Sequence, residues 1–304
     1  MNHDQSDTGA DADTDTRNHV GVVGLGLLGT AICERLLSES FTLSGYDVAA
    51  PCRRNAESLG VRTVENVPDV ARRCRRIVLC LPDSDVVARV ADELLTQLGP
   101  DSTVIDTTTG TPAAATTLGE RLAAQGCGFL EANVVGSSDH MRRHDAVLLV
   151  GGPSDDVARH GDLLAALGRE FFHVGGWGDG GRMKLVVNLV LGLNRAVLAE
   201  GLSFAAASGL DQQAALDVLS AGLAYSRVMD VKGPKMLAGE YSPQARLSQH
   251  LKDVRLILAS GCANGASLPL SAVHEQLLVR ATELGFADAD NSAVYEAFRH
   301  GDKP

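Results

Sequence analysis

The chain has 304 residues, 45% of them hydrophobic, and a formal net charge of −11. A chain of this length can bury two hydrophobic cores, so we expect two domains with an ordinary α/β composition. The acidic balance argues against a nucleic-acid surface. Residues 1–17 hold five aspartates and one arginine, which predicts a disordered acidic tail.

The location of the protein can be predicted from its apolar runs and its cysteines. No uninterrupted apolar run approaches the ~18 residues of a membrane span, and the polar N-terminus is unlike a signal or transit peptide. We therefore expect a cytoplasmic protein that does not enter a membrane. The six cysteines form no C-x-x-C pair and several lie in apolar segments, so we predict buried thiols rather than disulfides.

The first structural motif follows the predicted strand His19–Val23, where residues 24–29 read Gly-Leu-Gly-Leu-Leu-Gly before a helix from Thr30 to Ser38. In a G-x-G-x-x-G turn the glycines allow a tight turn, a close approach of the backbone to a pyrophosphate, and close packing of the helix on the strand. We predict that this loop binds a dinucleotide through Gly24, Leu25, Gly26, Leu27, Leu28 and Gly29.

The next strand, Phe41–Tyr46, ends in an acidic residue. Asp47 follows Gly29 by 18 residues, where a carboxylate holds the ribose diol of NAD. The same charge repels the 2′-phosphate of NADP, so we favour NAD. Arg53 and Arg54 lie just beyond and could receive that phosphate, which leaves NADP open.

Further strands are predicted at residues 76–81 and 103–106, each followed by a loop. Ligands of open parallel sheets lie beyond the carboxyl ends of the strands, so the Leu81-Pro82 loop and the Thr107–Pro112 loop should border the nicotinamide. Some of the threonine hydroxyls should also cap the helix after Pro112.

Two more strands, from Phe129 and at residues 146–150, flank residues 139–145. Here His140 and His144 are four apart, but no third ligand is apparent, so we predict an exposed polar loop without a metal.

The second half of the chain has helical patterns only. Apolar residues are so dense from Met183 to Ser208 that we predict a helix buried on most sides. Further helices are expected at residues 212–219, 245–262 and 270–284, with a basic turn at Lys232–Lys235. We therefore predict a Rossmann-type, doubly wound parallel α/β domain over residues 18–182 and an all-helical domain over residues 183–304.

A polar stripe lies on the first of these helices. Lys184 and Asn188 share one face, and Arg195 falls close to it. Apolar surroundings or a nearby cation can lower the pKa of a lysine enough for it to carry a proton, and a cleft is expected at the domain junction. The alternatives are a capping role for Lys184, a backbone contact for Asn188 and a structural salt bridge for Arg195.

With these motifs in hand, residues 19–298 resemble the β-hydroxyacid dehydrogenase family, which includes 3-hydroxyisobutyrate dehydrogenase and tartronate semialdehyde reductase and has a helical domain like that of 6-phosphogluconate dehydrogenase. Five stretches carry the resemblance in order: Gly24–Gly29, Leu81–Ser84, Asp106–Pro112, Gly178–Asn188 and Lys252-Asp253.

The resemblance implies an enzyme that transfers a hydride between NAD(P) and a small β-hydroxy acid or semialdehyde, and a homodimer or homotetramer packed through the long helix. It implies that Lys184 transfers the proton and that Asn188 holds the substrate. It further implies that the dinucleotide contacts Leu81, Pro82, Thr109 and Lys252, and that the substrate carboxylate meets Thr108, Gly136 and Ser137.

Two positions depart from the family pattern. Val135 stands where the family has a substrate-contacting serine, and Val187 stands where it has the first of two asparagines. Both lie near the expected substrate, which leaves the substrate open. A non-catalytic NAD-binding scaffold and an imine reductase-like enzyme remain alternatives, although the lysine favours carbonyl–alcohol chemistry.

Overall fold

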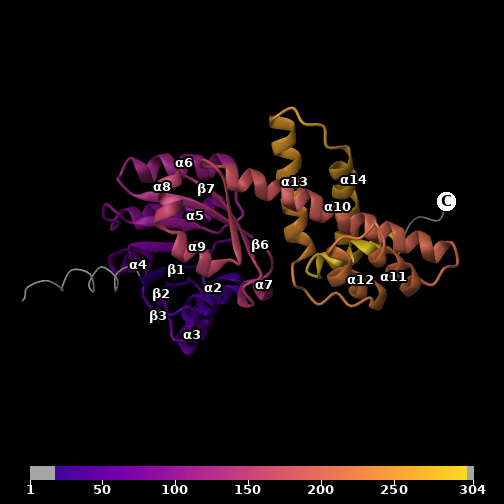
Figure 1. The fold of residues 1–304 in the computed structure, drawn as a ribbon, viewed down its shortest axis with the longest axis horizontal. Coiled ribbons are helices and arrows are strands. Elements are labelled where there is room, and N and C mark those ends of the chain that lie inside the picture. The colour runs from indigo at the N-terminus through magenta and orange to yellow at the C-terminus, as the bar shows by residue number, and fades with distance from the viewer. Residues whose placement is uncertain (1–17, 300–304) are drawn as a thin grey trace, which may run out of the picture. The chain divides into compact units, whose positions relative to one another are not determined.

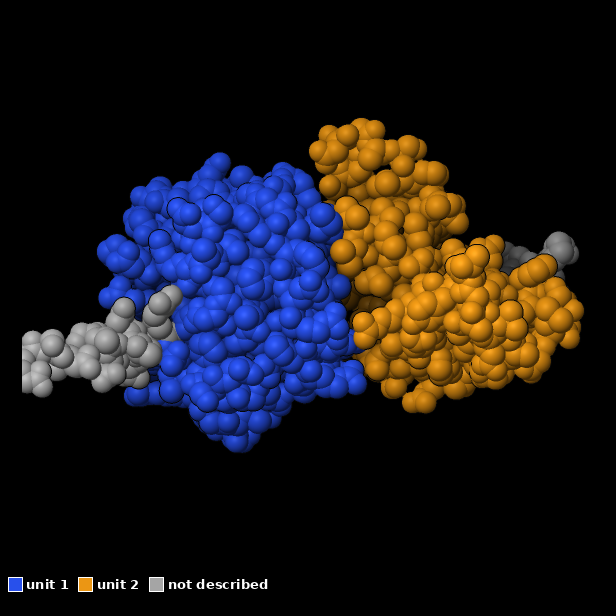
Figure 2. All heavy atoms as spheres, in the orientation of Figure 1, with its two compact units in different colours: residues 1–184 blue, residues 185–304 orange. Residues whose placement is uncertain are grey.

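The computed structural model describes residues 18–299, so the predicted acidic tail lies outside the described residues. The chain forms two compact units, residues 1–184 and residues 185–304, coloured blue and orange in Figure 2. Each unit has its own hydrophobic core.

Unit 1 is built on one eight-stranded sheet in the order β3-β2-β1-β4-β5-β6-β7-β8 (Figure 1). The strands are β1 (His19–Val23), β2 (Thr42–Tyr46), β3 (Arg62–Thr63), β4 (Arg76–Leu79), β5 (Thr103–Asp106), β6 (Gly128–Val135), β7 (Val147–Gly151) and β8 (Glu170–Gly175). The strand order reverses between β1 and β4, which is where open α/β sheets bind ligands.

The sheet confirms the predicted doubly wound α/β class, with one exception to the parallel pattern. All neighbouring strands are parallel except β6 and β7, which pair antiparallel with Asn133 opposite Leu149. The segment between Val135 and Val147 is too short to carry the chain across the sheet for a parallel pairing. β7 therefore runs antiparallel to β6. The edge strands β3 and β8 were not among the predicted strands.

The helices of unit 1 cover both faces of the sheet. They are α2 (Leu27–Ser38), α3 (Ala50–Ser58), α4 (Val67–Arg73), α5 (Ser84–Leu95), α6 (Pro112–Ala123), α7 (Ser138–Arg142), α8 (Ser154–Arg159) and α9 (Gly161–Leu167). Several begin at residues that suit a helix start. Asp83 accepts a hydrogen bond from the Val86 N–H, and Thr111 accepts one from the Ala114 N–H ahead of Pro112.

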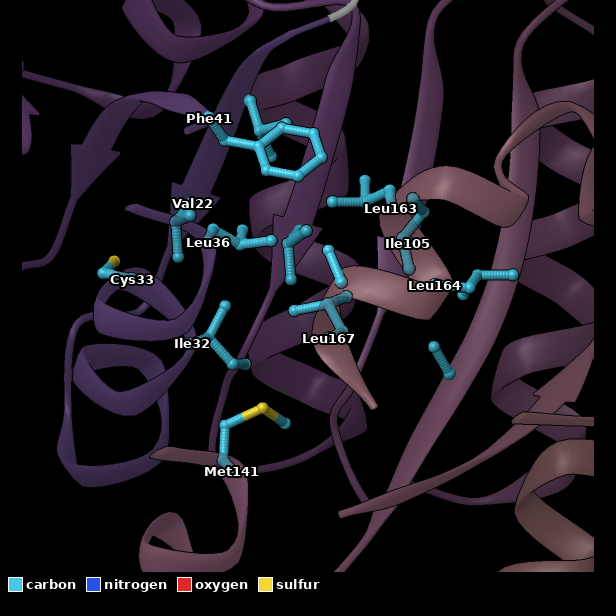
Figure 3. Close-up of a cluster of buried hydrophobic side chains, with 14 of the residues drawn as sticks. Val22, Ile32, Cys33, Leu36, Phe41, Ile105, Met141, Leu163, Leu164 and Leu167 are labelled. Atoms are coloured by element: carbon cyan, nitrogen blue, oxygen red, sulfur yellow. The ribbon is translucent and has the colours of Figure 1, made fainter. Parts of the chain in front are cut away.

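Two apolar cores follow from the alternation of side chains along the strands. Val22 and Leu130 contribute to one cluster, whereas their neighbours Val23 and Phe129 contribute to the other. Figure 3 shows the first cluster, in which Ile32 and Leu36 of α2 gather with Leu163, Leu164 and Leu167 of α9. Each buried aliphatic side chain of this size stabilises the fold by ~1.5–3 kcal/mol.

Unit 2 is helical, as predicted. Its helices are the continuation of α10 (Asp179–Ala207), then α11 (Gln212–Ala221), α12 (Val228–Ala238), α13 (Leu247–Ala263), α14 (Pro269–Ala281), η1 (Thr282–Phe286), η2 (Asn291–Tyr295) and α15 (Glu296–Arg299). Leu198, Leu202, Val254 and Leu278 belong to its core.

The basic turn predicted at residues 232–235 is wrong, because these residues lie inside α12 with Pro234 in the helix interior. Buried Met229 and Met236 hold the helix to the core, and Gly233 packs so closely that a Cβ atom there would lie 2.7 Å from Leu216. Tertiary packing therefore outweighs the helix-breaking tendency of Gly-Pro.

The prediction that α10 is buried on most sides is also wrong for one face. Val190, Val197 and Phe204 are exposed, and their seven-residue spacing places them on one side of the helix. By length and composition alone, α10 is long and apolar enough to cross a membrane. One such helix is weak evidence for a membrane protein, since core helices of soluble proteins meet the same criteria.

Two smaller predictions need correction. Residues 139–142 of the predicted polar loop lie in the short helix α7, because Ser137 caps it and Met141 anchors it in the core. All six cysteines are free thiols; Cys33, Cys74 and Cys127 are buried as predicted, but Cys262 is exposed.

Candidate cofactor and catalytic site

The glycine loop between β1 and α2 has the shape of a dinucleotide site. A Cβ atom on Gly24, which has a φ of 96°, would lie 2.1 Å from the Cys80 oxygen, and one on Gly29 would lie 1.9 Å from the Gly24 oxygen. Both positions therefore require glycine for close packing. Gly26 is different, because a Cβ atom there would meet nothing within 4 Å.

The N-terminus of α2 is suited to an anion. Gly26 is its N-cap residue and supplies no side-chain hydrogen bond to the first turn. Exposed N–H groups at such a terminus bind phosphate, and Gly26 and Leu27 are both exposed at this point. Leu25, in contrast, is a buried core side chain, so only its backbone can serve the loop. These features fit the pyrophosphate of a dinucleotide.

Asp47 connects the end of β2 to the glycine loop. Its Oδ2 atom accepts a hydrogen bond of 2.7 Å from the Leu25 N–H, and its Oδ1 atom accepts one of 2.8 Å from the Ala49 N–H. Each carboxylate oxygen has a second lone pair for a ribose hydroxyl. Arg53 lies at the same place, since it donates to the Asp47 main-chain oxygen and stands over the Tyr46 ring, 5.9 Å from its centroid.

The loops after β4 and β5 are tied together by Thr108. Its buried hydroxyl accepts a hydrogen bond of 3.1 Å from the Leu81 N–H, and its own N–H donates to Asp106 Oδ1 at 2.9 Å. At this edge Pro82 is exposed, and Leu81 and Thr109 are partly exposed. The structure therefore brings four of the predicted residues to the carboxyl end of the sheet.

A cavity of about 200 Å³ opens beside these loops. Its polar lining includes Ser84, Asp106, Thr108, Thr111 and Glu131. Burial raises the pKa of Asp106 to about 7, and the neighbouring charge of Glu131 adds to that rise, while hydrogen bonds from Thr108 oppose it. Asp106 and Glu131 stand opposite each other in the parallel register of β5 and β6.

Residues of the loop after β6 form hydrogen bonds with each other that were not predicted. Gly136 is exposed with a φ of 147°, at the edge of the range that favours glycine. The Ser137 N–H donates to His140 Nδ1 at 3.2 Å, and the Ser137 hydroxyl pairs with the same nitrogen at 2.8 Å. Ser137 therefore caps α7, and its backbone N–H already has an acceptor.

Lys184 is buried, with 8% of its surface exposed, in the second turn of α10. Its Nζ atom donates a hydrogen bond of 2.5 Å to the main-chain oxygen of Val134 in β6. The helix and the strand together fix the amine in one place.

Asn188 follows one helical turn later and belongs to unit 2, where it is also buried. Its amide donates to Asp253 Oδ2 at 3.1 Å. Lys252 lines a hollow of about 400 Å³ in the same unit, together with Leu251 and Arg255. Arg195 is buried as well; burial lowers its pKa to about 10, while the charges of Asp290 and Asp253 oppose that change.

One functional candidate escaped the sequence analysis. Glu131 is 4% exposed in the middle of the apolar strand β6, and it accepts hydrogen bonds from the Gly178 and Gly181 N–H groups. A lone acidic residue between Leu130 and Ala132 was the available signal. Over residues 18–299 there is no cluster of three or more His, Cys, Asp or Glu side chains that could hold a metal ion.

Two known protein families match this chain. Residues 19–175 match the family described as the NAD binding domain of 6-phosphogluconate dehydrogenase, and residues 178–298 match the NAD-binding family of NADP-dependent 3-hydroxyisobutyrate dehydrogenase. Glyoxylate/succinic semialdehyde reductase 1 of Arabidopsis thaliana is 30% identical over 284 residues, covering 92% of this chain and 98% of that protein.

Two further similarities are informative. The solved structure of 3-hydroxyisobutyrate dehydrogenase from Mycobacterium tuberculosis with L-serine superposes with a TM-score of 0.86 at 23% identity, over 92% of this chain and 99% of that one. Cytokine-like nuclear factor N-PAC of Mus musculus is 30% identical over 290 residues, 94% of this chain but only 52% of that protein.

The fold and the matched families define an NAD(P)-binding oxidoreductase that acts on CH–OH groups. The chain belongs to the β-hydroxyacid dehydrogenase family.

Proposed function

We propose that this protein reversibly transfers a hydride between NAD and the hydroxyl-bearing carbon of a small β-hydroxy acid, with Lys184 as the proton carrier. The observation that carries the proposal is the buried Lys184 amine held on the Val134 oxygen. Bound NAD supplies the hydride acceptor. In the oxidation direction a C–H bond and an O–H bond of the substrate break, a carbonyl forms, and the neutral amine accepts the hydroxyl proton.

The hydrogen bond to Val134 leaves the amine able to serve this role. A neutral amine has two N–H bonds and one lone pair. One N–H bond donates to the Val134 oxygen, so the lone pair can be directed at the substrate hydroxyl. Asn188, one turn further on the same helix, would bind the substrate, and its contact with Asp253 orients the amide. A group misplaced by ~1 Å can lower such a rate ~100-fold.

NAD is favoured over NADP because of Asp47. The carboxylate is fixed by the Leu25 and Ala49 N–H groups, so it cannot turn away from a 2′-phosphate without losing both bonds. Arg53 supports the opposite choice only weakly, since its guanidinium is engaged with the Asp47 and Val48 main-chain oxygens.

The substrate should be a short acid that carries an aldehyde or hydroxyl group. The relative from Arabidopsis thaliana is named for glyoxylate and succinic semialdehyde. Val135 and Val187 place apolar groups near the expected substrate, which would favour an aliphatic chain over one rich in hydroxyls. We therefore rank semialdehydes and their hydroxy acids first.

A screen of substrates tests the proposal. The wild type and the Lys184→Ala variant are assayed by nicotinamide absorbance. Glyoxylate and succinic semialdehyde are tested with NADH and NADPH, and 3-hydroxyisobutyrate, glycerate, threonate and serine are tested with NAD and NADP. The proposal predicts turnover of at least one compound with NAD or NADH and its loss in the variant. Full activity of Lys184→Ala on the best substrate would exclude the lysine as proton carrier.

A non-catalytic NAD-binding scaffold is the second candidate, because the N-PAC relative bears the name of a nuclear factor. The same screen separates the two: a scaffold binds NAD in calorimetry but turns over none of the six compounds. An imine reductase-like activity would be revealed by adding a cyclic imine as a seventh compound, with NADH or NADPH as the hydride donor.

The proposed assembly is a homodimer or homotetramer that covers the exposed face of α10, defined by Val190, Val197 and Phe204. A Phe204→Glu variant should then shift the mass in sedimentation to the monomer. We also propose a cytoplasmic location, which the six free cysteines support and which cell fractionation tests.

A further inference from the structure

A single carboxylate is buried inside an apolar strand of unit 1. Glu131 is 4% exposed, and its neighbours Leu130 and Ala132 are fully buried. Removing a carboxylate from water costs several kcal/mol unless hydrogen bonds replace the lost solvation. Burial accordingly raises the pKa of Glu131, while N–H groups of Gly178, Gly181 and Gly180 oppose that rise.

The partners of this carboxylate are the N–H groups at the start of α10. Glu131 Oε1 accepts from the Gly181 N–H at 3.0 Å, and Oε2 accepts from the Gly178 N–H at 2.5 Å. The first N–H groups of a helix have no partner within the helix, and a negative charge there is stabilised by the helix dipole. A residue of β6 therefore caps α10 from outside the helix.

Glu131 lies so close to its neighbours that several positions around it must be glycine. A Cβ atom on Gly181 would lie 3.2 Å from Glu131 Oε1, and one on Gly180 would lie 3.1 Å from the Glu131 Cβ atom. A Cβ atom on Gly151 would lie 2.6 Å from Glu131 Oε2. Side chains at these positions would push the strand and the helix start apart.

β6 contacts α10 at a second point, three residues further along the strand. Val134 accepts the hydrogen bond from Lys184, which lies three residues after Gly181. β6 thus contacts α10 through a carboxylate in the first turn and through a carbonyl in the second.

We propose that Glu131 is a positioning residue, which fixes the register of α10 along β6 and thereby the place of the Lys184 amine. The inference rests on the proposed role of Lys184 in proton transfer. Without the carboxylate, two N–H groups lose their acceptor and the first turn of α10 can fray or shift. A shift of ~1 Å would misplace the amine at a cost of ~100-fold in rate.

The test compares Glu131→Gln with a matched control. The glutamine keeps the shape but lacks the charge and presents an NH2 group to one of the two N–H donors. The control is Glu296→Gln, which changes a carboxylate that is also 4% exposed but lies in α15 of unit 2, where it accepts from the Tyr241 hydroxyl and Arg299. The full-length protein is used throughout.

Two measurements are made on each variant. Steady-state kinetics should show kcat lowered ~10- to 100-fold in Glu131→Gln, with KM and the Kd for NAD within about twofold of wild type. Hydrogen exchange should be faster in Glu131→Gln at the amides of residues 181–184 and unchanged in unit 2. Glu296→Gln should alter neither kcat nor exchange in the first turns of α10.

The outcomes separate the inference from the proposed function. Unchanged exchange at residues 181–184 overturns the positioning role, whatever the activity. Unchanged kcat in Glu131→Gln overturns it as well when Lys184→Ala is inactive, and the proposed function then stands. If Lys184→Ala is fully active, the proposed function fails, and faster exchange in Glu131→Gln shows only that the carboxylate holds the helix, so the catalytic part of the inference falls too.

Discussion

The Lys184 Nζ atom lies 2.5 Å from the main-chain oxygen of Val134, so a helix side chain is fixed by the backbone of a neighbouring strand. The acceptor is a carbonyl with no charge of its own. A carboxylate in its place would pair with the ammonium form and favour it strongly. The observed contact orients the amine through an uncharged acceptor, which suits the proposed role of accepting and releasing a proton.

Loss of this amine should abolish turnover and spare cofactor binding. We expect Lys184→Ala to lower kcat ~100- to 10,000-fold, the usual range for a general acid or base. Lys184→Arg should fail similarly, because a guanidinium stays protonated. Lys235→Ala serves as the control, since Lys235 lies in α12 of unit 2 and donates to the main-chain oxygen and the hydroxyl of Ser242. Steady-state kinetics and calorimetry with NAD check both; equal losses of kcat and NAD affinity would contradict the prediction.

The glycine loop allows a matched pair of substitutions. Gly26→Ala should fold with nearly wild-type stability, because its Cβ atom meets nothing within 4 Å, yet weaken NAD binding at least tenfold by intruding on the pyrophosphate. Gly29→Ala should instead destabilise the fold, because its Cβ atom would lie 1.9 Å from the Gly24 oxygen. Thermal unfolding and calorimetry separate the two effects, and similar stability losses in both variants would refute the distinction.

Cofactor choice should depend on Asp47. Asp47→Ala would remove the proposed ribose contact and the proposed repulsion of a 2′-phosphate, so the Kd for NAD should rise about tenfold while the Kd for NADP stays within about threefold. The variant also loses the bonds to the Leu25 and Ala49 N–H groups, so Asp47→Asn, which keeps an acceptor, is the control for loop structure. An equal change for both cofactors would remove the basis for preferring NAD.

Much of the nucleotide site could be predicted because its chemistry is local. The G-x-G-x-x-G loop and Asp47 lie within one strand–helix–strand unit, where spacing along the chain fixes spacing in space. The structure gives each glycine a distinct role, with Gly24 and Gly29 packed against the backbone and Gly26 open. Lys184 was predicted for a similar reason, as the one lysine where a glycine-rich segment runs into an apolar helix.

The missed features depend on contacts between distant segments. Glu131 accepts a hydrogen bond from the Gly178 N–H, which is 47 residues away in the sequence, so no short motif contains both groups. Ser137 was expected to meet a substrate, but the capping of α7 by Ser137 and His140 depends on the geometry of the turn after β6. Pro234 reads as a helix breaker, and only packing around Gly233 shows why α12 continues through it.

The pH dependence of stability should depend in part on Asp106. The pKa of this carboxyl rises from 3.8 to about 7, mainly through burial, so the folded state binds its proton more tightly than the unfolded state does. Stability from this group is therefore complete below pH ~4, is lost as the pH rises toward ~7, and changes no further above that. At ~1.4 kcal/mol per pKa unit the loss is at most about 4 kcal/mol.

Asp106→Asn should remove this dependence. The amide oxygen can still accept the hydrogen bond from the Thr108 N–H, so the loop after β5 keeps its shape. The variant should therefore become more stable relative to wild type as the pH rises from 4 to 7, and the difference should stay constant above pH 7. Urea unfolding at each pH measures it. Asp92→Asn, which changes an exposed carboxylate paired with Arg121, should show no such trend. A pH-independent difference for Asp106→Asn would mean that the carboxyl is already ionised at acidic pH, despite its burial.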